Sequence, residues 1–181
     1  MQKKGGFPAC IDISGNTGAN GRDGHNGMHH GESGQNGGPS VEGGVGGVAY
    51  IRITRVPNQP SAIQVSGTVH NQPFNQLFDL GPTNQLVIDA RGGNGGRGGD
   101  GGKGSDGRDG MNGIDATRYS SGTNGGPGGP GGNGGNSTNG SNGGNGGFVQ
   151  IIVSEADMDL LSMIGQVMVD GGFGGRAGKN G

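Results

Sequence analysis

The sequence has little of what builds an ordinary globular core. Of its 181 residues, 27% are hydrophobic and 4% are aromatic, and tryptophan is absent. A chain this poor in large apolar side chains buries too little surface for a conventional core of adequate size. The single cysteine, Cys10, excludes an intrachain disulfide framework and a cysteine-based zinc cluster.

Charge is scarce too. The 12 basic and 14 acidic residues are interspersed and leave a net charge of −2, so no basic patch points to nucleic acid as a partner. No stretch approaches the roughly 18 apolar residues that span a bilayer, and we expect no membrane insertion. Residues 1–8 lack the apolar region of a secretory signal. The start of the sequence does not decide the compartment, although an extracellular or surface location is favoured.

Glycine, in contrast, is abundant and periodic. The chain holds 50 glycines and 8 prolines, a content typical of disorder when it has no period. Here glycine recurs at every third position in three runs, within residues 18–37, 92–113 and 122–146. This period matches the polyproline-II helix, which has three residues per turn and no internal hydrogen bonds. The runs therefore predict polyglycine-II helices that exchange backbone hydrogen bonds with their neighbours.

A collagen triple helix and plain disorder are the alternatives. Collagen favours proline between its glycines, whereas these positions hold mostly asparagine, aspartate, arginine, lysine and a second glycine. The runs are also interrupted and flanked by strand-like segments. A bundle within one chain is therefore the favoured interpretation.

A longer repeat organises the chain. The strand-like segments 48–54 and 148–154 each follow Gly-Gly-x-Gly-Gly and lie 100 positions apart. Each series of glycines also follows a short apolar stretch that ends in aspartate, at Asp12, Asp89 and Asp170. We therefore expect a single domain over residues 1–181 that is built of repeated units. The units cover residues 10–87, residues 88–165 and, as an incomplete third, residues 166–181.

The connectors predict the remaining elements. Residues 62–69 and 76–80 are typical of two further strands around an Asn-Gln-Pro turn. A capping-box pattern at residues 154–157 opens a short α-helix near residues 155–164, which Gly165 closes. The expected fold class is mostly β plus polyglycine-II. Strands form a small β-sandwich or barrel base, and a bundle of glycine helices extends from it.

The number of glycine frames predicts the place of each run. A helix with glycine in two frames accepts neighbours on two faces, so residues 92–102, 125–135 and 143–147 are expected to lie centrally. Residues 15–37 and 104–113 have one frame and are expected to lie peripherally. The remaining frame of the first central run forms an outward ridge. Its members are Asn94, Arg97, Asp100 and Lys103.

The glycine runs resemble the polyglycine-II proteins. Two motifs carry the resemblance: Gly-Gly-Asn-Gly-Gly-Arg-Gly-Gly-Asp-Gly-Gly at residues 92–102 and Gly-Gly-Pro-Gly-Gly-Pro-Gly-Gly-Asn-Gly-Gly at residues 125–135. This group includes the N-terminal domains of Obg-type GTPases, the receptor-binding tip adhesins of phage long tail fibres, and the snow-flea antifreeze protein. The resemblance is confined to the runs. It implies a backbone structure and leaves function open, because these relatives use one scaffold for different tasks.

The relatives imply different functions. An Obg-like accessory domain implies an associated GTPase domain, yet no Gly-x-x-x-x-Gly-Lys-Ser/Thr phosphate loop is present. An ice-binding protein implies a flat face of small or threonine-like residues, whereas the outward positions here carry charged and amide side chains. An adhesin implies side-chain-rich loops between the runs, and two such loops occur, at residues 28–32 and 114–121.

These loops hold the candidate binding residues. His29 and His30 lie in the first loop, and with His25 and Glu32 they also suggest a metal site, although a solvated polar tip is the favoured interpretation. Arg118 and Tyr119 lie in the second, and both residue types are frequent in binding hot spots. The alternative, which is favoured, is that Tyr119 packs over the end of the runs. No catalytic pair, metal or cofactor motif is found.

We therefore expect a non-catalytic structural and interaction module. It either displays loops for adhesion or serves as a building block of a fibre or surface assembly. Its partner is a protein or a surface, including further copies of the same chain. Ice binding and an Obg-like accessory role are the alternatives.

Overall fold

The computed structural model describes residues 9–81 and 84–181, so residues 1–8, for which no secretory signal is expected, lie outside the described part. The chain divides into two compact units. Unit 1 combines Met1–Gly18, Glu42–Gly95 and Asn142–Gly174, and unit 2 combines Ala19–Val41, Gly96–Ser141 and Gly175–Gly181. Each unit thus collects segments from the beginning, middle and end of the chain. The named strands and the helix all belong to unit 1.

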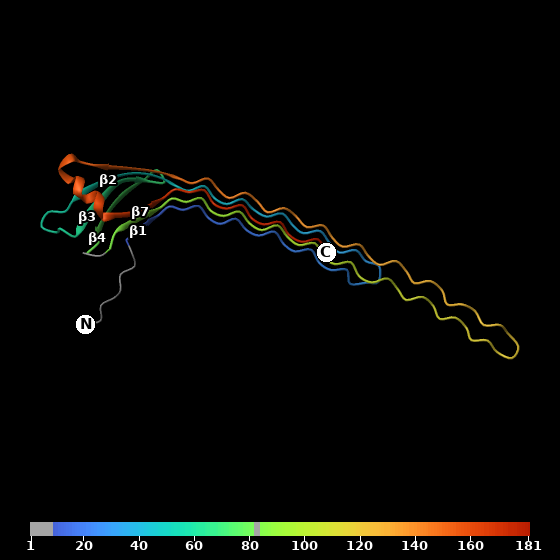
Figure 1. The fold of residues 1–181 in the computed structure, drawn as a ribbon. Coiled ribbons are helices and arrows are strands. Elements are labelled where there is room, and N and C mark those ends of the chain that lie inside the picture. Colours follow the sequence, from blue (N-terminus) through green and yellow to red (C-terminus); the bar gives the residue numbers. More distant parts are fainter. Residues whose placement is uncertain (1–8, 82–83) are drawn as a thin grey trace, which may run out of the picture. The chain divides into compact units, whose positions relative to one another are not determined.

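One sheet of unit 1 is parallel. It contains β1 (Cys10–Asp12), β5 (Leu86–Asp89) and β7 (Ile164–Met168), in the order β1-β5-β7 (Figure 1). These are the three apolar stretches that precede glycine runs, and their prediction as strands is confirmed. The third strand ends two residues before Asp170. Because the strands are parallel, all three following runs leave the same edge of the sheet.

The other sheet has the order β4-β3-β2-β6. Its strands are β2 (Val48–Arg55), β3 (Ala62–Val69), β4 (Gln72–Asp79) and β6 (Phe148–Val153). Strands β2 and β6 pair in parallel with Val48 opposite Phe148, so the strands expected 100 positions apart are confirmed. The turn predicted at residues 71–73 lies one to two residues too late, and the strand expected from residue 76 already begins at Gln72. His70 and Asn71, with φ of 51° and 58°, make the turn, and Pro73 already pairs with Thr68.

The predicted α-helix is a 3-10 helix, η1 (Glu155–Met163), and this corrects the expected helix type. The capping box does not form, because the Ser154 hydroxyl lies 3.1 Å from the Asp157 carboxylate and caps no backbone N–H. Asp157 itself has a non-helical φ of −115°, which interrupts the helix. Gly165 does not close η1, since it lies within β7. Arg55 of β2 donates to the Asp159 carboxylate at 2.6 Å and so links the helix to the sheet.

The two sheets share one hydrophobic core. Ile11 and Ile88 come from the parallel sheet, and Ile51, Ile53 and Val65 come from the other sheet. Leu160 of η1 is buried against the same cluster. The strands therefore form two separate sheets, not one closed barrel.

Unit 2 is built from glycine runs. Its described residues contain no helix or strand, and its single isolated β-bridge joins Thr117 and Ser120. Backbone hydrogen bonds join these runs at every third residue. Gly21, Gly24 and Gly27 donate to the carbonyl oxygens of residues 97, 100 and 103, at 2.7, 2.7 and 2.8 Å. In the same unit, residues 96–103 exchange such bonds with four neighbouring segments, which lie within residues 19–27, 35–41, 132–141 and 175–181.

The spacing of the runs requires glycine at the points of contact. A Cβ atom on Gly99 would fall on the carbonyl oxygen of Arg22, and one on Gly102 would fall on that of His25, far inside van der Waals contact. No side-chain rotation relieves an overlap with backbone. The glycines of residues 96–102 are accordingly half-buried or buried, as the two-frame pattern predicts.

The same pattern gives a wrong prediction for residues 125–131. All of them are exposed instead of central. This segment pairs with residues 105–111, where Gly126 and Gly129 donate to Met111 and Arg108 at 2.8 and 2.7 Å. The hairpin of residues 104–131, green-yellow to yellow-orange in Figure 1, extends past the turn at residues 28–31 and has no second described neighbour there.

Candidate functional site

The end of this hairpin is a tight loop that places two predicted binding residues at its corner. Thr117 and Ser120 form an isolated antiparallel bridge, with the Thr117 N–H donating to the Ser120 carbonyl oxygen at 2.9 Å. Arg118 and Tyr119 are the two residues between them. The Arg118 guanidinium carbon lies 5.9 Å from the centre of the Tyr119 ring, within the range of a cation–π contact.

Large apolar side chains surround this corner and are open to solvent. Tyr119 is 89% exposed, Met111 82% and Ile114 71%. The alternative that Tyr119 packs over the end of the runs is therefore wrong. The loop is also held from within, since Thr123 donates its N–H to the Ile114 carbonyl oxygen at 2.9 Å and receives the Ile114 N–H on its hydroxyl at 3.0 Å. We call residues 111–123 the tip loop.

His29 and His30 lie in a separate turn. Gly31 has a φ of 75°, and its N–H donates to the Asp106 carbonyl oxygen at 2.9 Å. The Glu32 carboxylate accepts the N–H groups of Met28 and His29, both at 2.9 Å. These two backbone hydrogen bonds hold the pKa of Glu32 below its usual value. Both histidine side chains are exposed beside a shallow hollow whose lining also includes Ser105 and Arg108.

The structure does not bring the two predicted pairs to one site. The turn contacts residues 105 and 106 through backbone hydrogen bonds. Arg118 and Tyr119 instead lie between Thr117 and Ser120, the bridged residues at the end of the hairpin. Of the two, the tip loop has the larger exposed apolar surface. It is the stronger candidate for recognition, because aromatic and arginine side chains dominate binding energy in protein interfaces.

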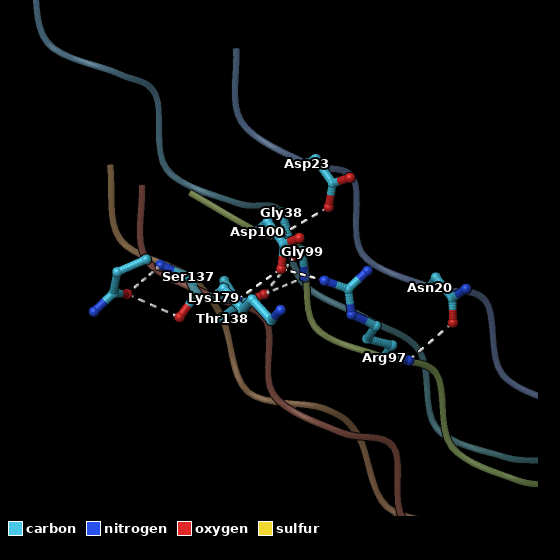
Figure 2. Close-up of polar contacts among 10 residues, drawn as sticks. Asn20, Asp23, Gly38, Arg97, Gly99, Asp100, Ser137, Thr138 and Lys179 are labelled. Atoms are coloured by element: carbon cyan, nitrogen blue, oxygen red, sulfur yellow. Dashed lines mark hydrogen bonds and ion pairs between the residues drawn. The ribbon is translucent and has the colours of Figure 1, made fainter. Parts of the chain in front are cut away.

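The predicted ridge combines exposed and structural side chains. Asn94, Arg97 and Lys103 are exposed, and Asp100 is half-buried. The Asp100 carboxylate pairs with the Arg97 guanidinium and accepts the N–H of Lys179 at 2.7 Å (Figure 2). The Arg97 hydrogen bond, followed by that from Lys179, holds the pKa of Asp100 below its usual value. In unit 1, the Asn94 side-chain oxygen accepts the N–H of Phe173 at 2.9 Å.

A second row of side chains binds backbone N–H groups, a role that is not among the expectations above. The side-chain oxygens of Asn20, Asp23 and Asn26 accept the backbone N–H groups of residues 97, 100 and 103, at 2.9, 2.8 and 2.8 Å. Figure 2 shows the first two of these contacts. The signal was present, because each acceptor stands immediately before a glycine of the three-residue pattern. Side-chain oxygens at these positions satisfy the N–H groups that the glycine frames leave unpaired.

Within residues 9–81 and 84–181, no group of three or more histidine, cysteine, aspartate or glutamate side chains is placed to hold a metal ion. In the same residues, no helix has the length and apolar character that crossing a membrane requires.

Comparison with models of protein families, with curated proteins and with solved structures finds no match to this chain.

Proposed function

We propose that this chain is a non-catalytic display module in which a polyglycine-II bundle carries the tip loop to a binding partner. Hydrogen bonds at every third residue and the exclusion of Cβ atoms at Gly99 and Gly102 support a polyglycine-II backbone. The resemblance of the runs to polyglycine-II proteins, which include adhesins, supports the same assignment.

One observation carries the functional part of the proposal. The tip loop exposes Tyr119, Met111 and Ile114 together, although the chain has few large apolar residues in total. Exposing them has a cost in solubility, and a cluster of this kind at the end of a rigid element is typical of a binding surface. The internal hydrogen bonds of the loop reduce the entropy that binding would otherwise remove.

Replacing Arg118 and Tyr119 with alanine is expected to reduce surface binding at least tenfold, because hot-spot residues each contribute about 2 kcal/mol or more. The measurement is flow cytometry of the fluorescently labelled protein on a panel of Gram-negative, Gram-positive and cultured animal cells. Both side chains are exposed, so the fold is expected to survive the double substitution.

Val45→Ala is the matched control, since Val45 is 65% exposed and lies in unit 1. It is expected to bind as the unchanged protein does. Equal binding by the double variant and the unchanged protein would contradict the role of the tip loop, as would the absence of binding to every cell type.

A second function, self-assembly, is favoured by a different observation. Within residues 125–131, Gly126 and Gly131 stand at positions where the chain leaves space. A Cβ atom on Gly126 would find its nearest neighbour at 3.7 Å, and one on Gly131 at 3.4 Å, both ordinary contacts. These two glycines are therefore not required by the contacts of the described residues. A run from another copy would require them.

One face of the segment 96–107 is covered by residues 175–181 along only part of its length. Gly98 and Gly101 donate their N–H groups to Arg176 and Lys179 at 2.9 and 2.8 Å. Three and six residues further on, Gly104 and Gly107 stand in the same frame, and the described residues provide no acceptor for their N–H groups. Like an unpaired sheet edge, such a row is a template for a further glycine run.

Sedimentation velocity over a wide concentration range tests the assembly. We expect concentration-dependent growth in size, and we expect Gly126→Ala to weaken the association at least tenfold because a single Cβ prevents close approach of two runs. The monomer tolerates this methyl group. A single small species at every concentration would reject self-assembly and leave the display function unaffected.

A further inference from the structure

We propose that a groove in unit 1, where three glycine runs leave the parallel sheet, binds a neutral pyranose sugar. The groove has a volume of about 420 Å³, within the usual range of small-ligand pockets. Its side-chain lining consists of Ser14, Thr17, Arg91, Asn94, Asp170 and Phe173. This site is separate from the tip loop, and the inference does not depend on the proposed display function.

The parallel sheet builds the groove. Strands β1, β5 and β7 end at the same edge, so the segments that follow them run side by side. The middle segment is bonded to both others: Gly15 donates to the Arg91 carbonyl oxygen at 2.8 Å, and Gly92 donates to the Asp170 carbonyl oxygen at 2.8 Å. Gly92 and Gly93 have no side chains. These two glycines therefore line the groove with backbone alone, and its polar and aromatic side chains come from the residues around them.

Phe173 provides an apolar platform. Its side chain is 82% exposed. Its backbone is held in place, because its N–H donates to the Asn94 side-chain oxygen at 2.9 Å. An exposed aromatic ring on a fixed backbone offers a flat apolar face. The axial C–H groups of a pyranose ring form a complementary flat face, and burying both against each other removes apolar surface from water.

Three side chains of the groove have polar groups that are free to bind hydroxyls. Among the described residues, the Asp170 carboxylate and the Thr17 hydroxyl have no hydrogen-bond partner. The Asn94 oxygen is occupied by Phe173, which leaves its NH₂ group with two donors. A sugar hydroxyl both donates and accepts, so a pair of neighbouring hydroxyls matches a carboxylate beside an amide. This combination beside an aromatic ring favours a saccharide over a purely apolar ligand.

Charge disfavours acidic sugars as ligands of this groove. Arg91 is the cation of the groove. Its guanidinium donates three hydrogen bonds to the Asp89 carboxylate, of which the shortest is 2.6 Å. Asp12 and Asp170 also act on the Arg91 guanidinium electrostatically. Three carboxylates around one guanidinium leave a net negative field. A sialylated, sulfated or phosphorylated sugar would meet repulsion.

A glycan array of neutral, amino-sugar, sialylated and sulfated glycans tests the proposal with the intact, labelled chain. We expect binding to neutral pyranose glycans. Phe173→Ala and Asp170→Asn are each expected to weaken binding at least tenfold. Both side chains are exposed, and the Phe173 backbone contact to Asn94 is retained in both variants.

Val45→Ala is the control, because it removes an exposed apolar side chain of the same unit that does not line the groove. It is expected to leave glycan binding unchanged. The proposal is overturned by absence of binding, by binding confined to sialylated or sulfated glycans, or by binding that Phe173→Ala does not weaken. Glycan binding that is lost in Tyr119→Ala and retained in Phe173→Ala would also overturn it, and would assign the sugar to the tip loop.

Discussion

Gly99→Ala is expected to lower the free energy of unfolding by about 3 kcal/mol or more, because its Cβ overlaps a neighbouring run. The added methyl group would fall on the carbonyl oxygen of Arg22. The N–H of Gly99 also donates to the Gly38 carbonyl oxygen at 3.3 Å and to the Thr138 hydroxyl at 2.9 Å. Separating the runs to admit the methyl group would lengthen these bonds as well. Urea unfolding, monitored by amide hydrogen exchange of unit 2, measures this loss of unfolding free energy.

Gly126→Ala is the matched control for this substitution. It introduces the same methyl group and the same change in backbone entropy, but the nearest atom lies 3.7 Å away. We expect its stability to lie within about 1 kcal/mol of the unchanged protein, on the stabilising side if the loss of chain entropy in the unfolded state dominates. Equal stability losses in the two variants would show that close contact between runs does not explain the glycines.

Ile88→Ala is expected to lower the free energy of unfolding by about 2–5 kcal/mol, the usual range for removing a buried isoleucine side chain. Ile88 lies in β5, the central strand of the parallel sheet, and its side chain is fully buried. Because the chain has few large apolar residues, the loss of one represents a large part of the core. Thermal unfolding monitored by circular dichroism gives the size of the loss.

Ile152→Ala provides the comparison for the core substitution. Ile152 is also a strand isoleucine, in β6, but its side chain is 41% exposed. Its removal is expected to cost less than about 1 kcal/mol, since little apolar surface returns to water. Similar losses at Ile88 and Ile152 would contradict the assignment of the core between the two sheets.

Much of the strand arrangement could be predicted from the sequence because repeats carry register. The apolar stretches before Asp12, Asp89 and Asp170 form the strands of one sheet, and the segments 100 positions apart pair with Val48 opposite Phe148. Each prediction depends on local alternation and on repeated spacing. Both are properties that a single sequence displays directly.

Other features depend on contacts that spacing does not reveal. Counting glycine frames gives the number of neighbours a run accepts, not the number it has, and for this reason the prediction for residues 125–131 is wrong. The choice of a 3-10 helix depends on Ser154, whose hydroxyl meets the Asp157 side chain in place of a backbone N–H. The exposure of Tyr119 depends on where other runs end. None of these features can be predicted from the spacing of residues along the chain alone.

The pairing within the hairpin of residues 104–131 makes its reach adjustable. Gly126, Gly129 and Gly132 donate to residues 111, 108 and 105, so each step of three residues in one arm matches a step of three in the other. Inserting one triplet in each arm would therefore preserve every existing hydrogen bond and carry the loop about 9 Å further from the turn at residues 28–31. Arm length is thus a quantity that insertions and deletions of triplets can tune, while the residues of the tip are free to vary independently.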